Sequence, residues 1–386
     1  MKSWERGRPA RWKKSAKLPF FFFCISTVIV AIGLSLALAQ NEFWTTATPS
    51  YEFDFARDQA NHPDYQFEQW AYSGQLTTND GRRFGYQLKF IRAGVSFKPA
   101  NPSRWAIRDL FVTQLAVTDV DGKQFKTAER LNRAGVGWAG AATESFRLWN
   151  EDWEARREQA NTLLRAVSDE DGVGLELTLE PGKPPVAHGE DGVFQKGFLA
   201  LNATHFYSQP RMSTRGVLLM NGQRFEVGGT STLDHEFGTS FLEEGQAGWD
   251  SFSIALEDGS DLMISQLRLA DGARDQYFIA TLVNADGSRE SLKLEDFSLE
   301  PMVRWTSAAS GASYPVQWRV TLPDKQIELE AKAALDNQEF QAAQSVGVTY
   351  WKGLIEVSGK RNGRPVGGKG FLEMTGYAKS VGKEEQ

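Results

Sequence analysis

Residues 80–90 read Asp-Gly-Arg-Arg-Phe-Gly-Tyr-Gln-Leu-Lys-Phe, and this stretch decides the fold class. Aspartate followed by glycine suits the two-residue turn of a β-hairpin, because both positions tolerate positive φ. After the turn, every second residue is large and apolar, namely Phe84, Tyr86, Leu88 and Phe90. A period of two, with Gln87 and Lys89 between, predicts a strand with one buried face.

The same signals recur along the chain. Nine Asn-Gly or Asp-Gly dipeptides begin at Asp80, Asp121, Asp171, Asp191, Asn221, Asp258, Asp271, Asp286 and Asn362. Apolar alternation returns in residues 316–322 and 327–333. Residues 150–165 have a helical composition but no clear stop signal, so we expect strand for most of them. The chain is therefore predicted to be all-β and antiparallel, with few helices.

An internal repeat divides the chain into two units. Trp70 and Trp249 each begin a strand, an Asp-Gly turn and a second strand that ends near an arginine. Each unit also closes with an Asn-Gly hairpin. Asp234 lies twelve positions after the glycine of the first hairpin, and Thr375 lies twelve positions after the glycine of the second. This predicts β domains at residues 50–240 and 245–380, with a boundary near 239–248.

Closure removes exposed sheet edges. An antiparallel sheet of about eight strands tends to curl into a barrel, which can hold one small apolar ligand. We therefore predict two small antiparallel β-barrels in tandem. One large two-sheet sandwich is the alternative.

The first 39 residues form a separate segment. A basic head precedes Leu18–Ala39, which is uncharged and largely apolar, and Ala37-Leu38-Ala39 fits a cleavage site before Gln40. This predicts a signal peptide and export to the periplasm or the extracellular space. The alternative is a retained membrane anchor, because 22 uncharged residues could span a bilayer and give membrane association through residues 18–39.

Charge and cysteine content limit the partners. Residues 40–386 carry a formal charge of −12, which argues against nucleic acid. The only cysteine, Cys24, lies in the apolar leader, so the exported part has no disulfide, cysteine metal site or thiol nucleophile.

Residues 234–236, Asp-His-Glu, are the strongest candidates for chemistry. A carboxylic acid near an apolar pocket keeps its proton at neutral pH and can donate it, which makes Asp234 a candidate general acid. The other reading is a turn carboxylate bound by backbone amides. In a regular strand His235 and Glu236 face opposite sides, and Glu236 shares its face with Asp234.

Other residues are assigned around that acid. His205 is expected to orient or reprotonate Asp234, or else to be a core histidine, and Tyr207 to line the cavity. Arg211 is expected to pair with Glu236 or to lie solvated at the rim. Trp70 and Trp249 are expected to pack the barrels or to contact a ligand. The only cluster of ligand type in the sequence is formed by His205, Asp234, His235 and Glu236, without metal-binding spacing, so we expect no metal and no cofactor.

Several motifs, taken in order, resemble AttH-like proteins. They are His62-Pro-Asp-Tyr65, Glu68-Gln-Trp70, residues 181–189, Tyr207-Ser-Gln-Pro-Arg211, Leu233-Asp-His-Glu-Phe-Gly238, Gly248-Trp-Asp-Ser-Phe252 and residues 370–377. The resemblance covers roughly residues 50–378. It implies a lipocalin-like fold in two halves, and the family includes the carotenoid 1,2-hydratases.

The resemblance also implies site residues. In the hydratases an aspartate at the position of Asp234 is the acid, assisted by a His-x-Trp pair and by a tyrosine two residues before the acid. His205 matches the histidine, whereas Tyr207 replaces the tryptophan and Thr232 replaces the tyrosine.

Two functions remain open at this point. One is an exported hydro-lyase that hydrates a double bond of a small apolar ligand, an isoprenoid or another lipid, with Asp234 as the acid. The other is a carrier or accessory protein of a membrane system that binds such a ligand without chemistry.

Overall fold

The computed structural model describes residues 44–101, 103, 105–239, 242–342, 345 and 347–378. The predicted leader, residues 1–39, lies outside this range. Within the described residues, no helix has the length and hydropathy that a membrane span needs.

The first sheet contains thirteen antiparallel strands. Eleven follow the order β4-β3-β2-β1-β13-β12-β9-β8-β7-β6-β5, and β10 and β11 pair with β12. The strands are β1 (Phe67–Thr77), β2 (Arg83–Gly94), β3 (Asp109–Asp119), β4 (Gln124–Arg133), β5 (Ala139–Ala141), β6 (Arg147–Asn150), β7 (Trp153–Glu158), β8 (Asn161–Ser168), β9 (Val173–Glu180), β10 (Val186–Ala187), β11 (Val193–Gln195), β12 (Ala203–Met220) and β13 (Gln223–Gly238).

The second sheet contains ten strands in the order β17-β16-β15-β14-β23-β22-β20-β19-β18, with β21 on β22. They are β14 (Gln246–Leu256), β15 (Asp261–Leu269), β16 (Arg274–Val283), β17 (Arg289–Ser291), β18 (Ser298–Thr306), β19 (Ser313–Leu322), β20 (Ile327–Ala333), β21 (Glu339–Ala342), β22 (Val348–Arg361) and β23 (Arg364–Thr375). Two 3-10 turns, η1 (Leu294–Asp296) and η2 (Pro323–Lys325), are the helical elements of the described residues.

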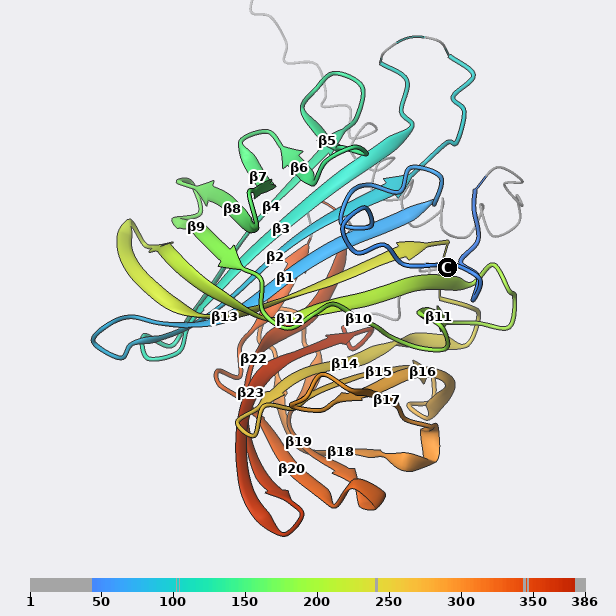
Figure 1. Cartoon of the computed structure of the whole chain (residues 1–386). Coiled ribbons are helices and arrows are strands. Elements are labelled where there is room, and N and C mark those ends of the chain that lie inside the picture. Colours follow the sequence, from blue (N-terminus) through green and yellow to red (C-terminus); the bar gives the residue numbers. More distant parts are fainter. Residues whose placement is uncertain are drawn as a thin grey trace, which may run out of the picture.

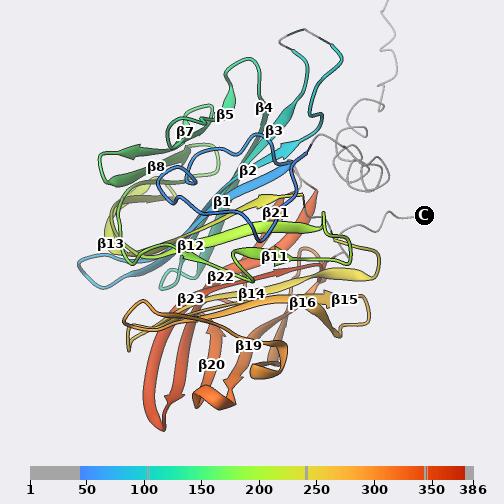
Figure 2. The same ribbon diagram turned by 45° about the vertical axis from the view of Figure 1, so that its right-hand side comes forward.

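The predicted all-β class is confirmed. Two large, strongly curved antiparallel sheets stack on each other, the first from blue through green to yellow and the second from golden yellow to red (Figures 1 and 2). Residues 150–165, where the composition suggested a helix, lie in β6, β7 and β8 and their turns. All nine Asn-Gly and Asp-Gly dipeptides lie between consecutive strands, and Asp191, Asn221 and Asn362 have positive φ.

The internal repeat is visible in the strand order. The first sheet has β2-β1-β13-β12 at its centre, and the second sheet has β15-β14-β23-β22. In both, a hairpin that begins the unit pairs with the hairpin that closes it. Each unit has its own apolar core: one contains Trp70, Phe84 and Leu233, and the other contains Phe252, Trp318 and Leu372.

The prediction of one buried face for β2 is wrong. Phe84, Tyr86 and Leu88 enter the first core as expected, but Gln87 and Lys89 on the other face are also buried, at 3% and 7% exposure. The reason is that the second unit covers this face, where β2 lies against β22 and β1 lies against β23.

Three small apolar clusters join the two units. Ala116 packs with Phe340 and Tyr350, Phe206 packs with Met263 and Ile279, and Val120 packs with Leu354 and Phe371. Buried polar side chains occupy the face between these clusters, and the candidate site begins there.

Candidate functional site

Side chains of β12 and β13 alternate between two environments. Leu233 and His235 of β13 face the first core, whereas Asp234 faces the second unit. Asp234 therefore does not point into the interior of the first unit, where a ligand in the first predicted barrel would have met it. The apolar face of β13 carries the odd-numbered residues, so an even-numbered residue emerges on the opposite side of the sheet.

Asp234 is partly exposed and is linked to the second unit through the side chains of Ser208 and His188. Ser208 Oγ donates to Asp234 Oδ1 at 2.5 Å. His188 bridges Ser208 Oγ at 2.9 Å and Thr281 Oγ1 of β16 at 3.0 Å. Burial raises the pKa of the Asp234 carboxyl above its ordinary value, against the opposing effect of the Ser208 hydrogen bond.

A narrow cleft opens beside Asp234 between the units. It has a volume of about 50 Å³ and is lined from the first unit by segments of β1, β12 and β13, including Ser208, Arg211 and Thr232. From the second unit it is lined by β14, β15 and β23, including Ile254, Met263 and Phe371. Its walls are mostly apolar, and Asp234 adjoins it through its hydrogen bond to Ser208, which lines the cleft.

An ionic cluster lies on the same interface. The Glu373 carboxylate accepts from Lys352 Nζ at 2.9 Å, from Lys89 Nζ at 3.3 Å and from Trp249 Nε1 at 3.2 Å. Burial alone would raise the pKa of Glu373, but the two ammonium groups outweigh it and hold that pKa well below its usual range. Burial lowers the pKa of Lys89. The charges of Lys352 and Glu373 also affect the pKa of Asp234, so the protonation of this acid depends on the ionic cluster.

The residues predicted to bind ligand are placed differently from expectation. Glu236 shares the face of Asp234, as parity predicts, but it bonds Lys196, Thr204 Oγ1 at 2.6 Å and Gln69 Nε2 at 2.8 Å. The predicted Arg211–Glu236 pair is wrong.

Arg211 instead donates to Asp261 Oδ1 at 2.7 Å and to the carbonyl oxygens of Leu256 and Ser260, each at 2.8 Å. A β-bulge between Gln209 and Met212, where Arg211 has φ 58°, turns its side chain toward the second unit.

His205, Tyr207 and Trp70 lie on the other face of the first sheet. His205 is fully buried against Tyr51 and Phe237, with ring centroids 4.4 and 5.0 Å away, and neither ring nitrogen bonds a described residue. Because His205 and Asp234 occupy opposite faces, the predicted assistance of Asp234 by His205 is wrong. Trp70 stacks on His235 at 4.9 Å. Of the seven predicted site residues, Asp234, Glu236, Arg211 and Trp249 therefore share the interface.

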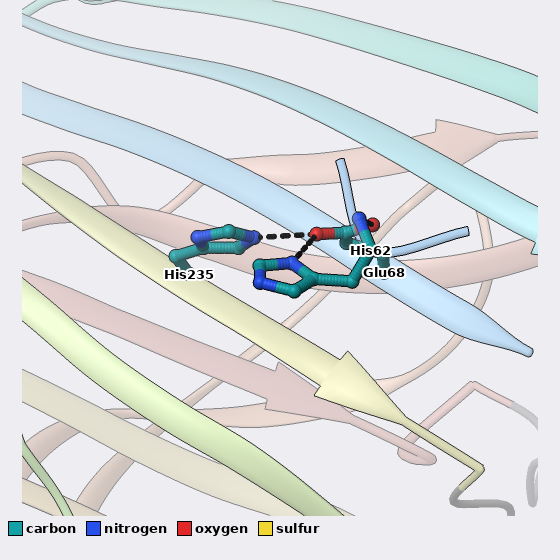
Figure 3. A group of neighbouring side chains, drawn as sticks. All are labelled: His62, Glu68 and His235. Atoms are coloured by element: carbon teal, nitrogen blue, oxygen red, sulfur yellow. Dashed lines mark hydrogen bonds and ion pairs between the residues drawn. The ribbon is translucent and has the colours of Figure 1, made fainter. Parts of the chain in front are cut away.

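A second polar cluster lies in the first unit, and sequence reasoning missed it. His62 Nδ1 lies 2.6 Å from Glu68 Oε1, and His235 Nε2 lies 2.9 Å from the same oxygen (Figure 3). The only set of ligand-type residues recognised in the sequence combined His235 with His205, Asp234 and Glu236, and no metal was expected there. This set does not come together, because those side chains alternate between faces. The sequence did contain a signal for the cluster that the structure shows, because His62 and Glu68 belong to two of the family motifs.

Charge sets the protonation of this second cluster. Burial would lower the pKa of His62, but the Glu68 and Asp58 carboxylates outweigh it and raise that pKa to about 9. Burial lowers the pKa of His235 and, together with the charge of His62, lowers that of His205 to about 4. The Glu68 carboxyl has a pKa well below its usual range: burial opposes ionisation, but His62, His235 and Arg92 favour it more strongly.

Comparisons with known proteins agree with this architecture. The sequence model of the AttH-like family matches residues 46–377. The crystal structure of an AttH candidate from Nitrosomonas europaea is similar over 86% of this chain and 99% of its own, with 30% identity and a TM-score of 0.78.

Kievitone hydratase from Nectria haematococca is similar over 87% of this chain and 97% of its own, with 15% identity and a TM-score of 0.67, which extends the likeness of fold. No curated protein sequence matches. Because the family model spans both sheets, this chain is a member of the AttH-like family.

Proposed function

We propose that this protein binds a small, largely apolar molecule between its two units and hydrates a double bond of that molecule, with Asp234 as the acid. The observation that carries the proposal is the position of Asp234. Its carboxyl has a raised pKa, remains partly exposed and accepts a hydrogen bond from Ser208, which lines a mostly apolar cleft. The fold shared with kievitone hydratase is consistent with a hydratase.

The chemistry follows from that position. The Asp234 proton moves to one carbon of the double bond and leaves a cation on the other carbon. Water attacks the cation, and the proton it releases returns to the Asp234 carboxylate. Alkene and water become an alcohol, and no other reactant is consumed. Ser208 holds Oδ1, which leaves Oδ2 to carry the proton.

The ionic cluster narrows the substrate class. Lys89, Lys352 and Glu373 together carry one net positive charge, and all three side chains are largely buried. An acidic group on the ligand would neutralise that charge. We therefore infer an unsaturated apolar chain with an acidic group, as in an unsaturated fatty acid or an acidic isoprenoid.

Hydration is tested in labelled water. Purified protein is incubated with oleate and with acidic isoprenoid alkenes in ¹⁸O-water, and mass spectrometry detects alcohols that carry the label. Asp234→Asn should abolish labelling without unfolding the protein. Asp250→Asn is the matched control, since Asp250 is a buried acid of β14 in the second unit and bonds Arg268 and Tyr377. Full turnover in folded Asp234→Asn would rule the mechanism out.

A carrier without chemistry is the second candidate. It is favoured by the separation of the predicted helpers, because His205 and Tyr207 face the first core while Asp234 faces the second unit. Native mass spectrometry would then detect a retained lipid, and Asp234→Asn would bind fluorescent fatty acids as the wild type does. Export, with delivery of the ligand to a membrane partner, belongs to the same proposal and rests on the leader sequence.

A further inference from the structure

Three ligand-type atoms converge in the first unit, on the face of β13 opposite Asp234. They are His62 Nδ1, Glu68 Oε1 and His235 Nε2, and all lie within 4.8 Å of one another. Figure 3 shows both rings directed at the same carboxylate oxygen, His62 from the segment before β1, Glu68 from β1 and His235 from β13. The function proposed for Asp234 does not use this group.

The outer nitrogen of His235 has an acceptor. His235 Nδ1 lies 3.0 Å from Tyr207 Oη, and the Tyr207 hydroxyl donates to the backbone oxygen of Asp58 at 3.0 Å. A hydroxyl has one proton, so Tyr207 Oη accepts from His235 Nδ1–H. In the neutral ring, Nε2 then directs a lone pair at Glu68.

His62 is arranged in the same way. Its outer nitrogen, Nε2, faces the buried Asp58 carboxylate at 3.5 Å and Tyr51 Oη at 3.4 Å. An acceptor at the outer nitrogen leaves the lone pair of neutral His62 on Nδ1. A carboxylate or other acceptor behind a histidine is the usual support of a metal-binding imidazole, because it fixes the tautomer and the ring orientation.

Glu68 is also oriented from behind. Its Oε2 accepts from the backbone N–H of His62 at 2.8 Å and from Arg92 Nη2 at 3.3 Å. The remaining oxygen, Oε1, is directed at the two rings and carries only lone pairs. The three ligand-type atoms therefore meet in a buried space, and a metal ion among them would replace the proton of His62 as the positive charge beside the Glu68 carboxylate.

We propose that His62, Glu68 and His235 bind a divalent first-row transition metal ion, with Zn²⁺ as the reference ion. Two imidazole nitrogens and one carboxylate oxygen form a donor set that suits zinc, and tetrahedral coordination leaves one position for water. The side chain of His62 is 13% exposed whereas those of Glu68 and His235 are fully buried, so the ion enters from the His62 side.

The ion has a structural consequence. His62 belongs to the segment that precedes β1, whereas the other two ligands belong to paired strands of the sheet. Binding fastens that segment over the first core, next to Tyr51 and Tyr65, which contact Phe237. Metal should therefore raise the unfolding temperature, since an ion that binds only the folded chain stabilises it.

Metal content and affinity test the proposal on the whole protein. After treatment with a chelator, zinc is restored, excess zinc is removed by dialysis, and the metal is counted by plasma mass spectrometry. We expect one zinc ion per chain, a visible absorption spectrum of tetrahedral Co²⁺ after substitution, and a higher unfolding temperature with zinc. Less than about a tenth of an equivalent in the folded wild type would overturn the proposal.

Variants locate the ion. Glu68→Gln, His62→Ala and His235→Ala should each weaken zinc binding at least about 100-fold, more than loss of a supporting residue. Tyr207→Phe removes only the support behind His235 and should weaken binding about tenfold.

Two matched controls accompany these variants. His188→Asn changes a buried, hydrogen-bonded histidine outside the cluster, and Tyr72→Phe changes a buried tyrosine hydroxyl without a described partner. Both should bind zinc as the wild type does. Undiminished zinc stoichiometry in folded His62→Ala and His235→Ala would place the metal elsewhere and refute the assignment. Circular dichroism identifies any variant that is misfolded, in which case the folded members of the series decide.

Discussion

Asp234 and His235 are consecutive residues of β13, and their side chains lie on opposite faces of the first sheet. Asp234 faces the second unit through Ser208, and His235 faces the first core through Glu68 and Tyr207. One tripeptide therefore contributes to two separate polar groups, which a strand makes possible because successive side chains alternate. Changes at the two positions should have independent effects.

Ser208→Ala should raise the pKa of Asp234 further. The Ser208 hydroxyl stabilises the ionised Asp234 carboxylate and thereby lowers its pKa. Without that hydroxyl, the increase in pKa caused by burial is opposed less strongly. Carboxyl-carbon NMR of the labelled protein would follow the titration directly. Ser73→Ala is the control, because Ser73 lines the same cleft from β1 without contacting Asp234 in any described hydrogen bond. An unchanged or lowered pKa in Ser208→Ala would contradict the assignment.

Sequence patterns predicted the fold because its determinants are local. Asp-Gly and Asn-Gly turns fix where strands end, and alternation in residues 316–322 and 327–333 fixes which side chains enter the second core. The burial of Lys89 could not be predicted in this way. It depends on β22 covering β2, a contact between residues more than 250 positions apart.

The site was predictable only in part, for the same reason. Parity alone places Asp234 and Glu236 together and separates them from His235. Which face meets the core depends on the register of β13 against β1, where Trp70 pairs with His235. The His62–Glu68–His235 cluster joins residues 167 positions apart, so spacing in the sequence could not indicate it.

Glu373→Gln should destabilise the folded protein by about 3–5 kcal/mol at neutral pH, because Lys89 and Lys352 lose their buried counter-ion. The pKa of Glu373 is lowered in the folded state, so its contribution is present above the unfolded value of 4.5 and is lost as the pH falls below it. Urea unfolding at pH 7 and at pH 3.5 measures both effects.

Glu300→Gln is the control for this prediction. Glu300 pairs with Arg319 at 2.7 Å, but both side chains are more than half exposed, so the change should cost no more than about 0.5–1 kcal/mol. If Glu373→Gln and Glu300→Gln reduce the unfolding free energy equally at pH 7, water screens the charges of the Glu373 cluster.

Asp250 makes a pH-dependent contribution to folding stability whose sign is opposite to that of Glu373. Burial, opposed by Arg268 and Tyr377, raises its pKa from 3.8 to about 6. The folded state therefore retains a proton that the unfolded chain has lost, and stability decreases as the pH rises from about 4 to about 6. The difference in unfolding free energy between wild type and Asp250→Asn should decrease by about 3 kcal/mol across that window and stay constant above it. A flat difference from pH 3.5 to 8 would mean that Asp250 titrates normally.

Arg211→Ala should weaken the connection between the two units. Arg211 extends from β12 to Asp261 and to two carbonyl oxygens of the β14–β15 turn, and removal of three charge-assisted hydrogen bonds costs about 2 kcal/mol for a partly exposed group. Arg215 lies four residues along the same strand, but its partner Glu180 is exposed, so Arg215→Ala should cost about 0.5 kcal/mol or less. Hydrogen exchange should show faster exchange in β14 and β15 for Arg211→Ala alone. If both arginine variants leave exchange in those strands unchanged, the apolar clusters alone hold the units together, and the cleft beside Asp234 keeps its shape without Arg211.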